Sequence, residues 1–182
     1  MAQALGGSQP AFEQIVRRYQ RPVLSLLVRL TGDRALAEDL AQETFVKAFR
    51  SLAAFDVTRR LSSWILRIAH NTGIDAMRRR RIPAVSIDTA GDPGNPYRRE
   101  PAAPLTPDPV ERAALGRALE TAMATLKPDQ RGAVALRYEE GLSFEEIGQV
   151  LGIPEVTARS HVHRARKELA RQLAAAGWEP TR

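Results

Sequence analysis

Apolar residues recur at helical spacing through the first third of the chain, and no segment alternates as a β-strand would. A first helix is predicted over residues 11–19. A second is predicted to open at Pro22, because proline is tolerated in the first turn of a helix. Asp33 is expected to cap a third helix over 34–52. The inward positions of these helices are Phe12, Ile15, Val16, Tyr19, Val23, Leu24, Leu26, Leu27, Leu30, Leu36, Leu40, Phe45, Ala48, Phe49 and Leu52.

A fourth helix, over 62–81, follows a predicted loop at 53–61 and is expected to take Ser62 as its cap. A polar row runs along one of its sides, and the helix ends in four consecutive arginines, 78–81. Such a run is usually solvated, but beside a polar row it favours contact with phosphates. The inward set is Trp64, Ile65, Ile68, Ala69, Thr72 and Ala76, and the polar row is Arg67, Asn71, Asp75 and Arg78.

The segment 82–108 has no hydrophobic period and reads as an extended linker. Seven of the chain's twelve prolines fall between positions 82 and 109, a composition that cannot bury enough apolar surface to fold alone. Helical spacing resumes after it. Helices are predicted from Pro109, behind an Asp108 cap, to about 126 and from Pro128 to about 138.

The stretch 141–171 has the pattern of a helix-turn-helix. Ser143 and Glu146 form a capping-box pattern, Gly152 is expected to stop the first helix in a left-handed turn, and Pro154 is expected to start the second. That second helix has one apolar face: Ala158, Val162, Ala165 and Leu169. Its remaining positions are basic or hydrogen-bonding, which favours DNA binding over the alternative of an amphipathic hairpin with a solvated charged face.

The composition fits two small helical domains rather than one large one. The chain has 182 residues and a net charge of +6, of which residues 1–81 contribute +7, residues 82–110 contribute −2 and residues 111–182 contribute +1. Two basic regions separated by a slightly acidic one indicate two nucleic-acid contacts. We therefore predict an all-α chain with domains at 8–81 and 109–176, the second carrying the helix-turn-helix, joined by the proline-rich linker 82–108.

Other function classes find no support in the residues. The absence of cysteine removes disulfides, thiolate zinc sites and cysteine nucleophiles. His161 and His163 point about 200° apart on a helix, so they cannot share a metal ion. There is no glycine-rich phosphate loop and no recognisable catalytic triad, so neither catalysis, a metal nor a cofactor is expected. No apolar run approaches a membrane span and the N-terminus lacks a signal-peptide pattern, so a cytoplasmic location is expected.

Two segments resemble the extracytoplasmic-function (group IV) sigma factors of bacterial RNA polymerase. AEDLAQETFVKAFRSL (37–52) with SSWILRIAHNTGIDAMRRRR (62–81) is similar to the first domain of that family. LKPDQRGAVALRYEEGLSFEEIGQVLGIPEVTARSHVHRARKEL (126–169) is similar to the second domain, which reads the −35 promoter element. The likeness covers nearly the whole chain in the family's order. It implies a non-enzymatic factor that binds core RNA polymerase and helps to open promoters.

The resemblance implies roles for residues of the first domain. Asp39, Gln42 and Glu43 match the surface that grips the clamp helices of the polymerase β′ subunit, and an acidic patch in a basic domain suits a basic protein partner. The loop and the following helix match the part that captures the single-stranded −10 element, with Asn71 in the base pocket. Trp64 is interpreted as core rather than as a stacking platform. The expected −10 contacts are Phe55, Arg59, Arg60, Arg67, Asn71, Arg78 and Arg79.

The second domain is expected to bind the polymerase β flap and the duplex −35 element. The expected DNA contacts are Thr157, Arg159, Ser160, His161 and Arg164. Three positions depart from the family: Val156 replaces a small residue, His161 an Arg or Lys, and Gly132 a Glu. The loop residues TRRLSS before Trp64 also differ from the family's pattern. Because histidine cannot make the bidentate contact that arginine makes with guanine, promoter preference is expected to differ there.

Two alternatives to the sigma-factor interpretation remain open from the sequence. The chain could be a repressor or activator that binds duplex DNA without polymerase, or an RNA-binding helical protein that uses the arginine run. A simple regulator would need neither the acidic surface at 39–43 nor Asn71, so these residues discriminate against that alternative. An anti-sigma factor that masks these faces is a possible further partner.

Overall fold

The computed structural model describes residues 9–81 and 109–178, and these residues are helical apart from short connections. The N-terminal half holds α2 (Gln9–Thr31), α3 (Arg34–Ser51), the short 3-10 turn η1 (Leu52–Ala54) and α4 (Leu61–Arg81). The C-terminal half holds α5 (Pro109–Thr125), α6 (Pro128–Tyr138), α7 (Phe144–Leu151) and α8 (Glu155–Ala175). The predicted all-α class is confirmed, whereas the linker lies outside the described residues.

The caps that start and stop these helices follow from the local sequence in most cases. Asp33 accepts a hydrogen bond from the Leu36 amide at 3.0 Å and so caps α3. Ser143 and Glu146 form the predicted capping box of α7, with reciprocal bonds of 3.1 and 2.8 Å. Gly152 ends α7 with a φ of +69°, a backbone conformation that favours glycine. These three predictions are confirmed.

Three predicted helix boundaries are wrong. Pro22 lies inside the single helix α2 instead of starting a second one. The lost hydrogen bond is offset because the continuous helix buries Ile15 on one side of the proline and Leu26 on the other. α4 begins at Leu61, so Ser62 lies in its first turn and is not its cap. Pro154 precedes α8, and its carbonyl accepts from the amides of Thr157 and Ala158.

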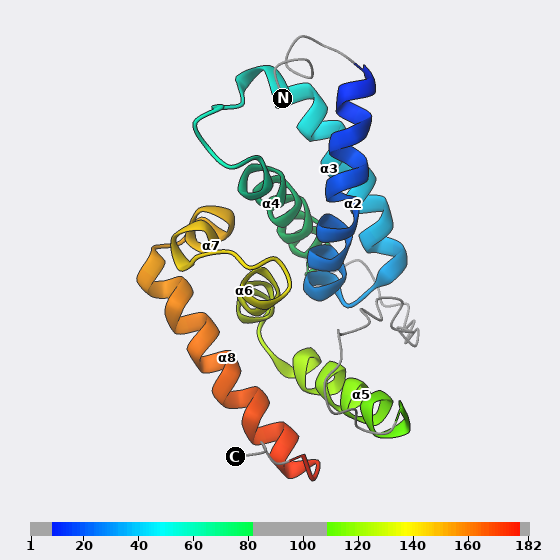
Figure 1. Ribbon diagram of the computed structural model, residues 1–182, viewed down its shortest axis with the longest axis vertical. Coiled ribbons are helices and arrows are strands. Elements are labelled where there is room, and N and C mark those ends of the chain that lie inside the picture. Colours follow the sequence, from blue (N-terminus) through cyan, green and yellow to red (C-terminus); the bar gives the residue numbers. More distant parts are fainter. Residues whose placement is uncertain (1–8, 82–108, 179–182) are drawn as a thin grey trace.

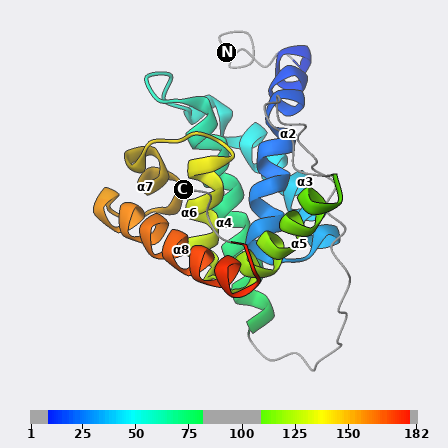
Figure 2. The same cartoon turned by 60° about the horizontal axis from the view of Figure 1, so that its bottom comes forward.

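The two halves pack against each other and share one apolar core. α6 packs on α2 and α7 packs on α4, and Figures 1 and 2 show α6 lying between the N-terminal helices and α8. The main cluster therefore joins Leu26, Leu30 and Ile65 to Leu136 and Ile147. A second, smaller cluster ties α5 and α6 to the C-terminal part of α8; it comprises Ala122, Met123, Leu126, Val134, Ala165 and Leu169.

Gly132 permits the close approach of α6 to α2. A Cβ built on Gly132 lies 3.4 Å from a Leu30 methyl group and 3.9 Å from a Leu26 methyl group, which is ordinary van der Waals contact. A methyl group therefore fits at this position, but a longer side chain would enter the apolar layer between the halves.

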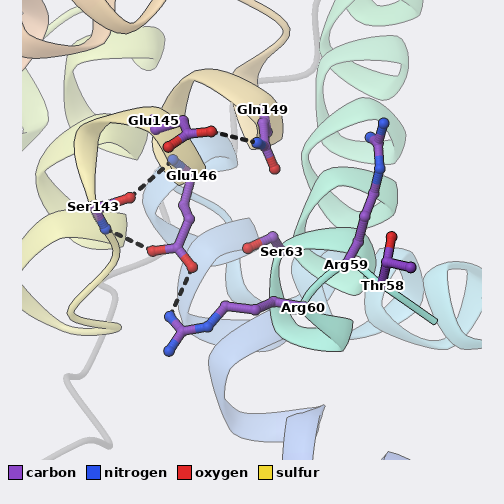
Figure 3. Close-up of a pocket in the computed structure, with 8 residues that line it drawn as sticks. All are labelled: Thr58, Arg59, Arg60, Ser63, Ser143, Glu145, Glu146 and Gln149. Carbon is purple, nitrogen blue, oxygen red and sulfur yellow. Dashed lines mark hydrogen bonds and ion pairs between the residues drawn. The ribbon is translucent and has the colours of Figure 1, made fainter. Parts of the chain in front are cut away.

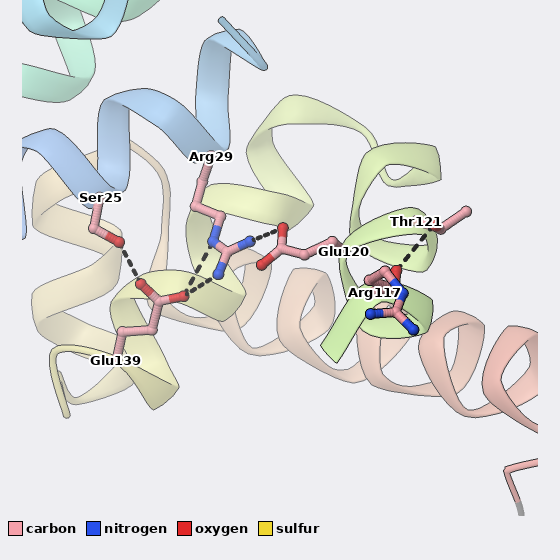
Figure 4. Close-up of polar contacts among 6 residues, drawn as sticks. All are labelled: Ser25, Arg29, Arg117, Glu120, Thr121 and Glu139. Carbon is pink, nitrogen blue, oxygen red and sulfur yellow. Dashed lines mark hydrogen bonds and ion pairs between the residues drawn. The ribbon is translucent and has the colours of Figure 1, made fainter. Parts of the chain in front are cut away.

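A polar cluster at the rim of this layer also joins the halves (Figure 4). Arg29 of α2 pairs with Glu139, at 3.0 Å, and with Glu120 of α5, and Ser25 donates to Glu139. Burial on its own would lower the pKa of Arg29, but its bonds to the two carboxylates outweigh burial and raise it. All three guanidinium nitrogens of Arg29 therefore contact carboxylate oxygens in this arrangement.

Candidate polymerase and nucleic-acid interfaces

The three residues of the predicted acidic surface lie on one side of α3. Asp39 and Gln42 are exposed. Glu43 is half-buried and pairs with Lys47 at 2.7 Å, while Lys47 also donates to Thr72 of α4 at 3.2 Å. Carboxylate and amide groups are therefore displayed on a helix that is braced against α4.

Sequence reasoning missed the apolar continuation of this surface. Val46 and Phe49 are 50% and 51% exposed, although Phe49 was predicted to point inward. The buried face of α3 is centred on Ala37, Leu40, Thr44 and Ala48, so Phe49 lies at its edge with its ring 4.9 Å from that of Phe12. The signal was present in the sequence, because Val46 and Phe49 follow Asp39 and Gln42 at i+7, two helical turns later.

The predicted polar row on α4 is exposed. Arg67, Asn71, Asp75 and Arg78 all lie at the surface, and Arg78 is 3.9 Å from Asp75. In the terminal arginine run, Arg79 is exposed and Arg80 pairs with the α3 cap Asp33 at 3.3 Å. Apart from the carboxylate of Asp75, the row consists of hydrogen-bond donors, which suits binding to a nucleic-acid strand.

Two aromatic residues near this row belong to the core side of the loop. Phe55 is only 7% exposed and its ring lies 5.0 Å from the ring of Trp64, which is itself half-buried. Phe55 was expected to touch DNA, but its burial in this arrangement gives it a packing role. The inward interpretation of Trp64 agrees with its place against the main cluster.

The two loop arginines differ in their surroundings (Figure 3). Arg59 lies 3.4 Å from Asp56, which also caps the turn by accepting from Thr58. Arg60 pairs with Glu146 of α7 at 2.7 Å across a polar groove of about 440 Å³. The groove is lined by Thr58, Arg59, Arg60, Ser63, Ser143, Glu145, Glu146 and Gln149.

Glu146 makes two interactions at once: it completes the capping box of α7 and it pairs with Arg60. Burial opposes its ionisation, but the hydrogen bonds from the Ser143 amide and from Arg60 outweigh burial and lower its pKa. A residue expected to contact DNA is therefore held by the other half of the chain.

The helix-turn-helix places the five predicted −35 contacts unevenly. Arg159 and Arg164 are exposed, whereas Thr157, Ser160 and His161 are half-buried. The Nδ1 atom of His161 is buried and has no hydrogen-bond partner in the described part of the chain. The predicted apolar face of α8 is confirmed: Ala158, Val162, Ala165 and Leu169 are buried.

The turn between α7 and α8 is unusually close. A Cβ built on Gly148 would lie 2.7 Å from the carbonyl oxygen of Ile153, which is backbone and cannot swing away. Gly148 therefore allows the start of α8 to lie directly against α7, and this contact fixes the angle of the exposed helix.

Comparison with known proteins follows the same division into halves. Residues 15–82 match the family model of sigma-70 region 2, and residues 116–169 match that of sigma-70 region 4. The ECF RNA polymerase sigma factor SigW of Bacillus subtilis is 35% identical over 171 residues, covering 92% of this chain and 91% of SigW. The chain belongs to the extracytoplasmic-function sigma factors of the sigma-70 family. As a sigma factor, it binds core RNA polymerase and promoter DNA, and the polymerase-independent regulator is not favoured.

Other relatives agree with this assignment. The sigma factor CarQ of Myxococcus xanthus is 37% identical over 167 residues, covering 92% of this chain and 91% of CarQ. The ECF sigma factor SigE of Mycolicibacterium smegmatis is 37% identical over 171 residues, but this chain spans 63% of its length. Both support the same family.

Two solved structures resemble this sigma factor over almost its full length. CnrH in complex with the cytosolic domain of CnrY has a TM-score of 0.67 and 28% identity, covering 96% of this chain and 94% of CnrH. RpoE in complex with the anti-sigma factor NepR, from Bartonella quintana, has a TM-score of 0.67 and 26% identity, covering 90% and 97%. The likeness in both cases extends across the two halves.

None of the helices within 9–81 and 109–178 is long and apolar enough to cross a bilayer. The same residues bring together no group of three His, Asp or Glu side chains that could hold a metal ion.

Proposed function

We propose that this sigma factor holds core RNA polymerase through the exposed side of α3. Asp39 and Glu43 supply negative charge, Gln42 supplies a hydrogen-bonding amide, and Val46 and Phe49 supply an apolar centre, a combination typical of protein interfaces. The partner surface is the β′ clamp helices. The C-terminal half binds the β flap.

Promoter reading is divided between α4 and α8. Asn71 takes a base of the melted −10 strand, and Arg59, Arg60, Arg67, Arg78 and Arg79 hold its backbone. Arg159 and Arg164 are the leading −35 contacts on α8, with Thr157, Ser160 and His161 at its edge. The observation that carries this function is that α3 and α4 each expose a polar surface that duplex binding by α8 alone would not use.

The two halves of the chain separate when the −10 and −35 promoter elements are bound at the same time. Sites centred 25 base pairs apart are about 85 Å apart in B-form DNA. In the compact chain α8 packs on α7, and α7 packs on α4. The two promoter-binding helices, α4 and α8, therefore lie roughly two helix diameters, about 20 Å, apart. Opening breaks the Arg60–Glu146 and Arg29–Glu139 pairs and frees Arg60 for the DNA backbone.

The chain supplies binding free energy rather than catalysis and acts in the cytoplasm, where the polymerase works. The two solved relatives are complexes with CnrY and with the anti-sigma factor NepR. A partner of that kind would hold this chain in its compact form.

Two variants test the division of labour. Replacing Asp39, Gln42 and Glu43 together by Ala is expected to weaken core polymerase binding on the order of 100-fold while the helical fold is kept. Asn71→Ala is expected to keep recruitment but to lower open-complex formation about tenfold, because base contacts of this kind are worth 1–3 kcal/mol. Co-purification and permanganate footprinting measure these two steps. Unchanged co-purification of the triple variant would refute the α3 interface.

A further inference from the structure

One aromatic ring joins the three helices that build the helix-turn-helix and its support. Phe144 is the first residue of α7 and is half-buried against the main core. The guanidinium carbon of Arg137, on α6, lies 4.7 Å from the centre of its ring. The guanidinium carbon of Arg159, on α8, lies 5.0 Å from the same centre. Both distances are within the range of cation–π attraction.

The position of the ring is fixed from its own side. Ser143, directly before it, caps α7 through the bond to the Glu146 amide. Arg137 donates to the carbonyl oxygen of Leu142 at 2.8 Å and so holds the residues that lead into the cap. The Ser143 cap and Arg137 together restrict the movement of Phe144. Its ring is therefore a fixed surface for the Arg159 guanidinium.

Arg159 is exposed but restrained. Its side chain is 64% exposed, and within the described part of the chain its hydrogen bonding is to Glu155, at 2.7 Å. The guanidinium has five N–H donors. Contact with the Phe144 ring uses the attraction of the ring for the cation, and it leaves N–H donors available for a base edge.

We propose that Phe144 is a positioning residue that orients Arg159 for reading a guanine in the −35 element. This inference rests on the proposed role of α8. Arginine reads guanine by two hydrogen bonds to O6 and N7, which requires a fixed plane. Without the ring, Arg159 would lose more side-chain entropy on binding and would be held by Glu155 alone, whose carboxylate competes for the same donors.

The test uses the full chain with core polymerase and a promoter library in which the −35 region is randomised. Arg159→Ala is expected to remove the preference at one base pair. Phe144→Leu keeps apolar volume but removes the ring, and it is expected to weaken that same preference about two- to fivefold. Phe144→Tyr, which keeps the ring, is the matched control and should behave as the parent chain.

The double variant distinguishes positioning from packing. If Phe144 acts through Arg159, Phe144→Leu adds nothing to the base preference once Arg159 is Ala. An effect that persists in that background, or that lowers use of all −35 sequences equally, would overturn the proposal. If Arg159→Ala itself leaves the preference intact, the role of Arg159 in the proposed function fails as well. Thermal unfolding checks the fold, and Phe144→Met provides the same test if the leucine variant does not fold.

Discussion

The two reading helices, α4 and α8, differ in how the core surrounds them. α4 packs against α2 and α3 in its own half and against α7 in the other, so buried residues lie on several of its sides. α8 also has three helical neighbours, but these follow one another along a single side, with α7 near its start and α5 near its end (Figure 1). It therefore buries one narrow stripe.

This difference determines what each helix can change. The exposed row of α4 is bounded by core positions such as Ala69 and Thr72, so a new base preference there must be compatible with packing. On α8 the exposed positions are independent of the stripe, and they can vary without disturbing the fold. Of the positions expected to depart from the family, the exposed Val156 and the half-buried His161 lie on α8, whereas Gly132 lies on α6.

The largest expected effect comes from disrupting the apolar layer between the two halves, which holds α7 against α4. Gly132→Glu would place a carboxylate among Leu26, Leu30 and Leu151, and an unpaired buried charge costs about 3–5 kcal/mol. The halves should therefore separate, which small-angle scattering would detect as a larger radius of gyration. Gly132→Ala is the control, because a methyl group fits and the helix gains about 1 kcal/mol in propensity. A compact glutamate variant would contradict the role given to this layer.

The next effect is confined to α8. Gly148→Val would force a side chain against the Ile153 carbonyl oxygen and should destabilise the C-terminal half by about 3 kcal/mol. Reading of the −35 element should be lost, while binding of core polymerase through the α3 surface is kept. Gly73→Ala on α4 is a matched comparison, because its Cβ would lie 3.1 Å from a Leu27 methyl group, which can move. Thermal unfolding should show the smaller loss for Gly73→Ala; an equal loss would argue against a special turn.

Acid should weaken the packing around α4 through His70. This residue is 5% exposed, and neither ring nitrogen has a hydrogen-bond partner in the described part of the chain. Burial lowers its pKa, while the charge of Asp129 on α6 and the neighbouring Asn71 side chain oppose that change in part. Below the ordinary value of 6.5 the unfolded chain binds more protons than the folded one, so stability falls as the pH falls towards the lowered pKa.

His70→Leu removes the titrating group. The parent chain should lose more unfolding free energy than this variant between pH 7 and pH 5, as measured by urea denaturation. If the parent chain and His70→Leu lose the same unfolding free energy, the acid sensitivity comes from carboxylates elsewhere in the chain.

The smallest effect is expected for the pair Arg60–Glu146. Arg60 is 71% exposed, so water screens the pair and its contribution to stability is at most about 1 kcal/mol. Arg60→Gln should leave thermal stability within about 1 kcal/mol and slow promoter melting. Glu145→Gln, on the same groove, is the control without such a pair. A large loss of stability in Arg60→Gln would mean that the pair holds the halves together.

The sequence predicted α8 better than α4, and the reason is physical. Periodicity identifies one buried face, and α8 has only one, so its stripe was predicted correctly. On α4 the buried Leu66 and His70 were missed, because a helix in an independent domain would not need a further buried side. The burial of Phe55 against Trp64 depends on how the loop folds back onto α4, and the ring contact of Phe49 is with Phe12 of another helix.

Local chemistry was the other reliable guide. The caps at Asp33 and Ser143 involve residues three apart, so the sequence contains all of their partners. The Arg29–Glu139 and Arg60–Glu146 pairs join residues 110 and 86 positions apart, and no spacing rule predicts them. The contact of Phe144 with Arg137 and Arg159 was also not foreseen, although each residue lies in a segment that was correctly predicted to be helical.

The core shared by the halves determines how much apolar surface the free chain exposes before it binds polymerase. If the halves came apart in water, each would lose apolar cover: Leu26 and Leu30 of α2 belong to one half, and Ile147 and Val150 of α7 belong to the other. Each half thus shields the apolar surface of the other from water. In the compact chain this apolar surface is covered.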